Sequence, residues 1–112
     1  MPGQLLTDRP ADGVLRLTIS NPDKRGALDH AILDGLAEHV AAAGDDGETR
    51  SIIVTGDGRH FSSGYDIGDI PDDVFAVEAE RLVAHPFTSA LQALDATDLP
   101  TVAAINGPAI GG

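Results

Sequence analysis

The 112-residue chain contains no cysteine, which excludes a disulfide framework, a thiolate metal site and a cysteine nucleophile. Aromatic residues make up only 4% of the sequence, so platforms for stacking the bases of single-stranded nucleic acid are not expected. The apolar runs are short, and none approaches the ~20 residues that a membrane-spanning helix requires. The first eight residues also lack the basic region and apolar segment of a signal peptide. The sequence therefore predicts a cytoplasmic protein without membrane contact.

Positive charge is scarce: 7 basic residues stand against 18 acidic ones, and the net charge is −11. This balance argues against a general surface for nucleic acid or anionic membranes. Any polyanionic ligand must therefore be held by a local cluster of positive charge and backbone donors. Lys24 and Arg25 form the only adjacent basic pair, although an exposed loop with solvated charges explains them equally well.

Apolar residues make up 42% of the sequence, and no linker or repeat divides it, so we expect one domain or part of one. Runs at 5–9 and 14–20 flank a turn and predict a β-hairpin. Apolar residues on one helical face predict a helix from the N-cap Asp29 to Gly44. A β-branched run at 50–55 predicts a strand. A second helical region is expected from Val74 to about residue 98, interrupted or restarted at Pro86. This order indicates an α/β fold with a right-handed βαβ unit.

The stretch from Thr101 to Gly112 organises the rest of the chain. Its apolar run, Val102 to Ile105, predicts a strand buried on both faces. Turn residues follow, and glycines 111 and 112 lie where the chain would enter a helix. Bare backbone N–H groups in such a turn can bind an anion or a polarised oxygen. A second glycine-containing turn, Gly56 to Tyr65, also follows a strand, where α/β folds place their ligands.

Several other motifs fit the sequence less well. Position 61 is Phe where a dinucleotide fingerprint needs its third glycine, and the G-x-S-x-G elbow is absent around Ser62 and Ser63. The four histidines have no metal-ligand spacing, so no metal site is expected. Asp66 and Asp69 are acid–base candidates by type, but a cap on a following helix explains Asp66 better. Gly107 to Gly112 matches the first six positions of a phosphate-binding P-loop, although Pro108 removes a backbone donor from the cradle.

Three segments, in this order, resemble the N-terminal part of the enoyl-CoA hydratase/isomerase (crotonase) superfamily. They are Asn21-Pro-Asp-Lys-Arg-Gly-Ala-Leu28, Ile52-Ile-Val-Thr-Gly-Asp-Gly-Arg-His-Phe-Ser-Ser-Gly-Tyr-Asp-Ile67 and Pro100-Thr-Val-Ala-Ala-Ile-Asn-Gly-Pro-Ala-Ile-Gly-Gly112. The resemblance covers roughly residues 10 to 112. It implies a spiral of ββα repeats, with residues 1–112 as the N-terminal part of a single acyl-CoA-binding domain. It also implies homotrimers or dimers of trimers.

The resemblance implies chemistry on acyl-CoA thioesters, as in fatty acid metabolism, with two backbone N–H groups stabilising a thioester enolate. In this sequence those donors are Tyr65 and Gly112. The CoA part of the substrate is expected along Lys24, Arg25, Ala27, Leu28, Ser63, Tyr65, Asp66 and Ile67. No separate cofactor, metal or nucleic acid is implied.

Two departures from the family pattern bear on specificity. Gly26 stands where Asn usually precedes Ala-Leu, which affects the geometry of the CoA loop. Tyr65 is bulkier than the common Ala and is expected to narrow the acyl pocket. The acid–base glutamates of hydratases lie beyond the position of Gly112, so hydratase, isomerase, hydrolase and decarboxylase chemistry all stay open, as does whether the chain is a fragment. The alternatives are a P-loop-like nucleotide-binding domain and a non-catalytic member that binds acyl-CoA or oligomerises.

Overall fold

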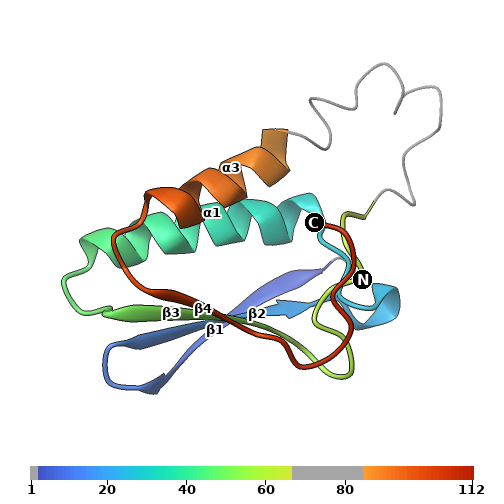
Figure 1. Cartoon of the computed structure of the whole chain (residues 1–112), viewed down its shortest axis with the longest axis horizontal. Helices are drawn as coiled ribbons and strands as arrows, with labels where there is room; N and C mark the ends of the chain where they lie inside the picture. Colours follow the sequence, from blue (N-terminus) through green and yellow to red (C-terminus); the bar gives the residue numbers. More distant parts are fainter. Residues whose placement is uncertain (1–2, 67–84) are drawn as a thin grey trace.

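The computed structural model describes residues 3–66 and 85–112, in which four strands form one sheet in the order β1-β2-β3-β4. Helices α1 and α3 lie on the same side of this sheet (Figure 1). Strands β1 and β2 are antiparallel, whereas β2, β3 and β4 run parallel to one another. In chain order the elements are β1 (Gln4–Ala11), β2 (Val14–Ser20), a 3₁₀ turn (Pro22–Lys24), α1 (His30–Asp45), β3 (Ser51–Gly56), α3 (His85–Ala96) and β4 (Thr101–Ala104).

The hairpin and the first helix follow the sequence pattern. In β2, Leu15, Leu17 and Ile19 are buried in alternation with half-buried neighbours, which is the period of a strand with one face on the core. The Asp29 carboxylate caps α1, because one of its oxygens accepts a hydrogen bond of 2.9 Å from the Ile32 N–H. The helix continues one residue past the expected end at Gly44, to Asp45.

Strand β3 pairs with β2 in parallel, which confirms the predicted βαβ unit. The crossover helix α1 places its apolar stripe over the sheet, and α3 packs along α1. The largest completely buried side chains come from β2, α1 and β3: Leu17, Ile32, Leu33, Val40 and Ile52. The core therefore fixes β2 and β3 relative to α1. The loop that follows β3 begins at the end of a strand that this packing holds in place.

The last strand is present as predicted, but its predicted burial is wrong. All four residues of β4 are exposed, and Val102 retains 56% of its surface. Within the described part of the chain, β4 pairs with β3 on one side, and α1 and α3 leave its faces uncovered. A continuous apolar run indicates that a strand is suited to burial. It does not indicate which element covers the strand.

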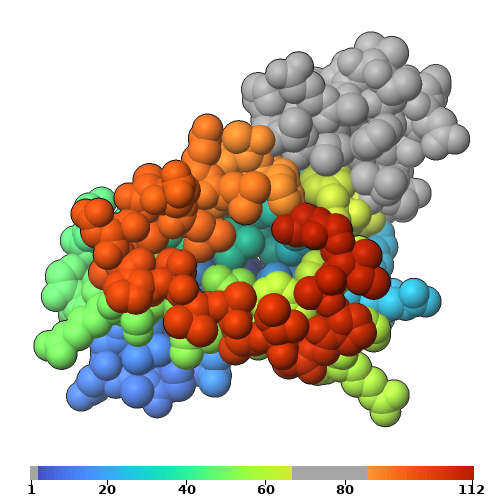
Figure 2. Space-filling view, viewed as in Figure 1, coloured from blue at the N-terminus to red at the C-terminus, as the bar shows by residue number. Residues whose placement is uncertain are grey.

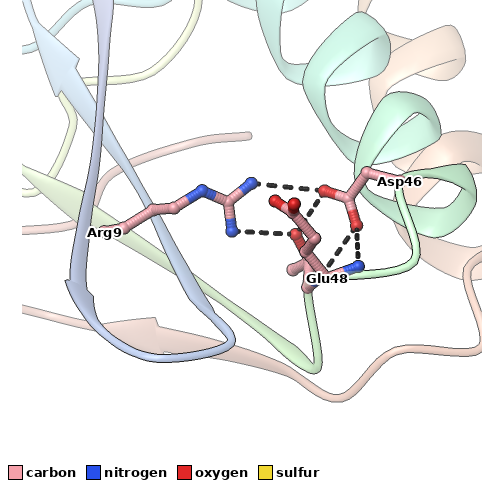
Figure 3. Close-up of polar contacts among 4 residues, drawn as sticks. Arg9, Asp46 and Glu48 are labelled. Atoms are coloured by element: carbon pink, nitrogen blue, oxygen red, sulfur yellow. Dashed lines mark hydrogen bonds and ion pairs between the residues drawn. The ribbon is translucent and has the colours of Figure 1, made fainter.

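A polar cluster joins β1 to the loop between α1 and β3 (Figure 3). The Asp46 carboxylate accepts hydrogen bonds from the Thr49 hydroxyl, from the Thr49 N–H and from the Glu48 N–H, at 2.6, 2.8 and 2.7 Å. The Arg9 guanidinium donates to Asp46 at 3.2 Å and to the Thr49 hydroxyl at 3.1 Å. These donors, the Thr49 hydroxyl first, hold the pKa of Asp46 well below its usual range.

We expect Asp46→Asn to lower the thermal unfolding temperature at neutral pH. A carboxyl whose pKa is depressed by folding stabilises the native state above its unfolded pKa of about 3.9 and loses that contribution as the pH falls. The difference from wild type should therefore be largest above about pH 5 and shrink in more acidic solution. Thermal melts followed by circular dichroism at several pH values test this. Asp45→Asn removes the same charge one residue earlier and is the control; equal effects of the two variants would contradict the assignment.

Three expectations lie outside the described residues: the first part of the helical region from Val74, the candidate carboxylate Asp69 and the CoA-contacting residue Ile67. No helix within residues 3–66 and 85–112 combines the length and the apolar character needed to cross a membrane.

Candidate functional site

The segment after β2 forms a tight loop that is closed by a buried asparagine. The Asn21 amide donates to the Ala27 carbonyl at 3.0 Å, and the Asn21 carbonyl accepts from the Gly26 N–H at 3.0 Å. Arg25 and Gly26 both have positive φ, 57° and 76°. A Cβ on Gly26 would lie 3.1 Å from the Phe61 carbonyl oxygen. Glycine at this position therefore has a physical reason, since it combines a left-handed backbone with close approach of the next loop.

The loop after β3 is bound to this first loop along its length. The Ser62 hydroxyl donates to the Gly26 carbonyl at 2.8 Å, and the Ser63 hydroxyl donates to the Lys24 carbonyl at 2.9 Å. A parallel bridge follows, in which the Leu28 N–H donates to the Gly64 carbonyl and the Leu28 carbonyl accepts from the Asp66 N–H. The structure thus brings together the two sequence segments that were expected to bind CoA.

The residues that were expected to bind CoA differ in burial and in charge. Ala27 and Leu28 are buried at 6% exposure each, so their side chains belong to the core. Lys24 forms an ion pair of 3.0 Å with Asp66, in which the lysine side chain stays 39% exposed. Arg25 is exposed on the left-handed turn. Ile67 lies outside the described residues.

The same loop also meets the glycine turn after β4. The Pro108 carbonyl accepts from the N–H groups of Phe61 and Ser62 at 3.0 and 3.3 Å, and the Ile110 N–H donates to the Ser62 carbonyl at 3.0 Å. A Cβ placed on Gly64 would be 2.8 Å from the Ile110 carbonyl oxygen and 3.6 Å from the Gly111 Cα. The two glycine turns are therefore in contact.

The two expected N–H donors come directly after the glycines of this contact. Tyr65 directly follows Gly64, and Gly112 directly follows Gly111. Gly112 also lies against the ring of Phe87, which any side chain at position 112 would strike. The contacting glycines, Gly64 and Gly111, are 47 residues apart in the sequence, and the fold joins their two turns. The groups expected to act there are backbone donors rather than charged side chains.

The Tyr65 side chain is directed to the start of α1. Its hydroxyl and the His30 Nε2 are 2.5 Å apart, and the two rings are tilted by 55° with centroids 6.0 Å apart. Burial, followed by the negative charges of Asp66, Asp29 and Asp34, raises the pKa of the phenol, so it stays protonated at neutral pH. His30 is exposed, and no pattern in the sequence indicates its pairing with Tyr65.

An apolar hollow of about 370 Å³ lies between α3, the sheet and residues 109–112 (Figure 2). Phe61 and Phe87 contribute to its wall, and Tyr65 is not among the described residues that line it. The narrowing of an acyl pocket by Tyr65 stays a prediction.

A metal centre and a P-loop find no support in the described parts of the chain. No group of three or more histidine or acidic side chains in residues 3–66 and 85–112 is arranged to hold a metal ion. The Ile110 N–H, which a phosphate cradle would require, is used by Ser62.

A sequence profile of the family described as enoyl-CoA hydratase/isomerase matches residues 9–112. The chain belongs to the enoyl-CoA hydratase/isomerase family. Among curated members, a probable enoyl-CoA hydratase of Mycobacterium bovis, echA6, is 37% identical over 102 residues. That alignment covers 90% of this chain and 38% of the relative. The 4-chlorobenzoyl coenzyme A dehalogenase-1 of an Arthrobacter species is 32% identical over 103 residues, with 90% and 37% covered.

Solved structures of this family share the fold of the chain. The Pseudomonas aeruginosa protein DspI superposes with a TM-score of 0.81 at 28% identity, over 93% of this chain and 41% of that protein. The crotonase-type α/β fold expected from the sequence is thereby confirmed. The chain spans about two fifths of the length of these enoyl-CoA hydratase/isomerase relatives.

Proposed function

We propose that the protein binds an acyl-CoA thioester and stabilises the enolate that forms when a proton leaves the α-carbon or a nucleophile adds at the β-carbon. In either event, negative charge develops on the thioester oxygen. The Tyr65 N–H and the Gly112 N–H are the donors that receive it. Two donors fixed before the reaction lower the barrier because they need no reorganisation when the charge appears.

The observation that carries this proposal is the contact between Gly64 and the Ile110–Gly111 backbone, since it joins the two turns on which the donors lie. A side chain at Gly64 would separate the turns, because its Cβ would lie 2.8 Å from the Ile110 carbonyl oxygen. Family membership supports the same substrate class, because the relatives are named enoyl-CoA hydratases and a chlorobenzoyl-CoA dehalogenase.

We assign the CoA moiety to the joined loops at 24–28 and 63–66, and Ile67 stays a prediction from the sequence. Lys24 and Arg25 supply positive charge for its phosphates, which an acidic protein otherwise repels. Asp66 pairs with Lys24, which orients the ammonium group and offsets part of its charge. Arg25 forms no ion pair within residues 3–66 and 85–112, so we assign the rest of that attraction to it. We also assign the Ser63 side chain and the backbone at Ala27 and Leu28 to the CoA contact. CoA itself is part of the substrate, so no further cofactor is proposed.

The reaction is proposed at the level of the family, as a lyase or isomerase of the hydratase/isomerase type. The proposed enolate-stabilising donors lie among the described residues, and they would serve hydration and isomerisation alike. A homotrimer or dimer of trimers in the cytoplasm stays the prediction for its assembly and location.

Calorimetry on the protein as the cell makes it tests the ligand class. We expect binding of CoA thioesters such as crotonyl-CoA, and no binding of ATP or of free crotonate. Tight ATP binding without binding of any acyl-CoA would refute the proposal. Binding of acyl-CoA without turnover of any tested thioester would instead support the non-catalytic alternative.

A further inference from the structure

Asn106 lies at the end of the apolar run that contains β4, and its side chain reaches the loop after β3. Its Oδ1 accepts a hydrogen bond of 3.0 Å from the Gly56 N–H. Its Nδ2 donates to the carbonyls of Gly58 and His60 at 2.9 and 3.2 Å. An N–H can only donate and a carbonyl can only accept, so the surroundings fix the orientation of this amide. One side chain thereby fixes three backbone positions of the neighbouring loop.

These bonds lie where the two site-forming segments first meet. Gly107 permits the approach, since a Cβ at this position would collide with the Arg59 carbonyl. Beyond this point the segments run side by side through the bonds of Pro108 and Ile110 to the loop at 61–62. The contact between Gly64 and Gly111 lies at the far end of the same run.

We expect the position of the Gly64–Gly111 contact to depend on the register of the two segments at Asn106. The glycines in the loop at 56–64 allow several backbone conformations, so contacts with neighbouring segments have to fix its path. A side chain that offers one acceptor and two donors admits a single register of the loop against β4. A carboxylate of the same shape keeps the acceptor for Gly56 and presents negative charge to two carbonyl oxygens.

We propose that Asn106 is a positioning residue, which sets the register of the two turns and through it the separation of the Tyr65 and Gly112 donors. It does not touch substrate. The hydrogen bonds alone support the effect of Asn106 on the register. Its effect on catalysis rests on the proposed function.

The test compares Asn106→Asp with Thr55→Val in the protein as the cell makes it. Thr55 is the matched control because its hydroxyl donates to the Ala104 carbonyl at 2.8 Å, so the substitution also removes a side-chain bond between β3 and β4. Both variants are first checked for a cooperative thermal transition. Amide hydrogen exchange then reports the loop register, and the infrared carbonyl band of bound crotonyl-CoA, labelled with ¹³C at the thioester carbon, reports polarisation by the donors.

We expect Asn106→Asp to speed amide exchange at Phe61, Ser62 and Ile110 and to reduce the red shift of the carbonyl band. Turnover should fall by roughly 10- to 100-fold with little change in KM, because a displacement near 1 Å at a reacting centre has about this effect. Thr55→Val should leave all three readouts near wild type. Asn106→Gln, which keeps both functions of the amide, should restore part of the turnover.

Two results separate this inference from the proposed function. An unshifted carbonyl band in the wild-type protein would refute the proposed function, and the exchange measurement would still decide whether Asn106 sets the register. If the carbonyl band is shifted in wild type, and Asn106→Asp changes neither this shift nor amide exchange, the inference about Asn106 is refuted and the proposed function is not.

Discussion

Tyr65→Pro is expected to lower turnover by on the order of 10²–10³, the effect of losing one oxyanion donor. Proline has no backbone N–H and fixes φ near −65°, so the substitution removes the proposed donor whatever happens to the side chain. The hydrogen bonds on either side, from Leu28 to Gly64 and from Asp66 to Leu28, do not involve the Tyr65 N–H. The protein should therefore stay folded, which circular dichroism can verify, while steady-state kinetics with acyl-CoA substrates records the loss.

Tyr65→Ala is the matched comparison, because it keeps the N–H and removes the phenol with its contact to His30. We expect it to retain appreciable turnover and to shift the preference toward bulkier acyl groups. Tyr65→Phe removes the hydroxyl alone and should lie between this variant and wild type. If Tyr65→Ala were as inactive as Tyr65→Pro with its fold intact, the phenol itself would be catalytic and the assignment of this position to a backbone donor would be wrong.

Gly64→Ala is expected to reduce turnover by ~10²-fold, since misplacement of a reacting group by about 1 Å has this effect. The added Cβ would lie 2.8 Å from the Ile110 carbonyl oxygen, which belongs to the backbone of the facing turn and cannot rotate away. The two turns must then separate, and with them the proposed donors. The backbone at Gly64, with φ of 96°, adds conformational strain to this collision.

Gly58→Ala is the control that separates the backbone strain of an alanine at positive φ from the displacement of the two turns. Gly58 lies in the same loop with φ of 83°, and a Cβ there would meet nothing within 4 Å. Both variants should lose stability, by about 1–2 kcal/mol for a left-handed alanine. Only Gly64→Ala should lose turnover beyond what its lower stability explains. Equal turnover in the two variants, measured well below their unfolding temperatures, would show that the Gly64 contact does not position the donors.

Much of the fold could be predicted from short-range patterns. The runs at 5–9 and 14–20 predicted a β-hairpin, and the structure confirms it as β1 and β2. Asp29 was predicted as an N-cap, and its carboxylate bonds the Ile32 N–H. Such features depend on neighbours a few residues away, so the sequence records them directly. The burial of Val102 failed as a prediction because burial depends on which element covers a strand, and a run of apolar residues does not specify that element.

The sequence by itself determined the elements, their order and the family, because strand and helix periods, turn residues and long glycine motifs are local. It also indicated which two turns could carry backbone donors. Only the tertiary structure decided that Gly64 and Gly111 touch, that Lys24 is paired with Asp66, and that His30 holds the Tyr65 hydroxyl. The Asn106 contacts were hidden for the same reason, since its partners lie 46 to 50 residues away in the chain. A hydrogen bond needs atoms about 3 Å apart, and only the packing of the sheet and helices brings residues so distant in sequence to that separation.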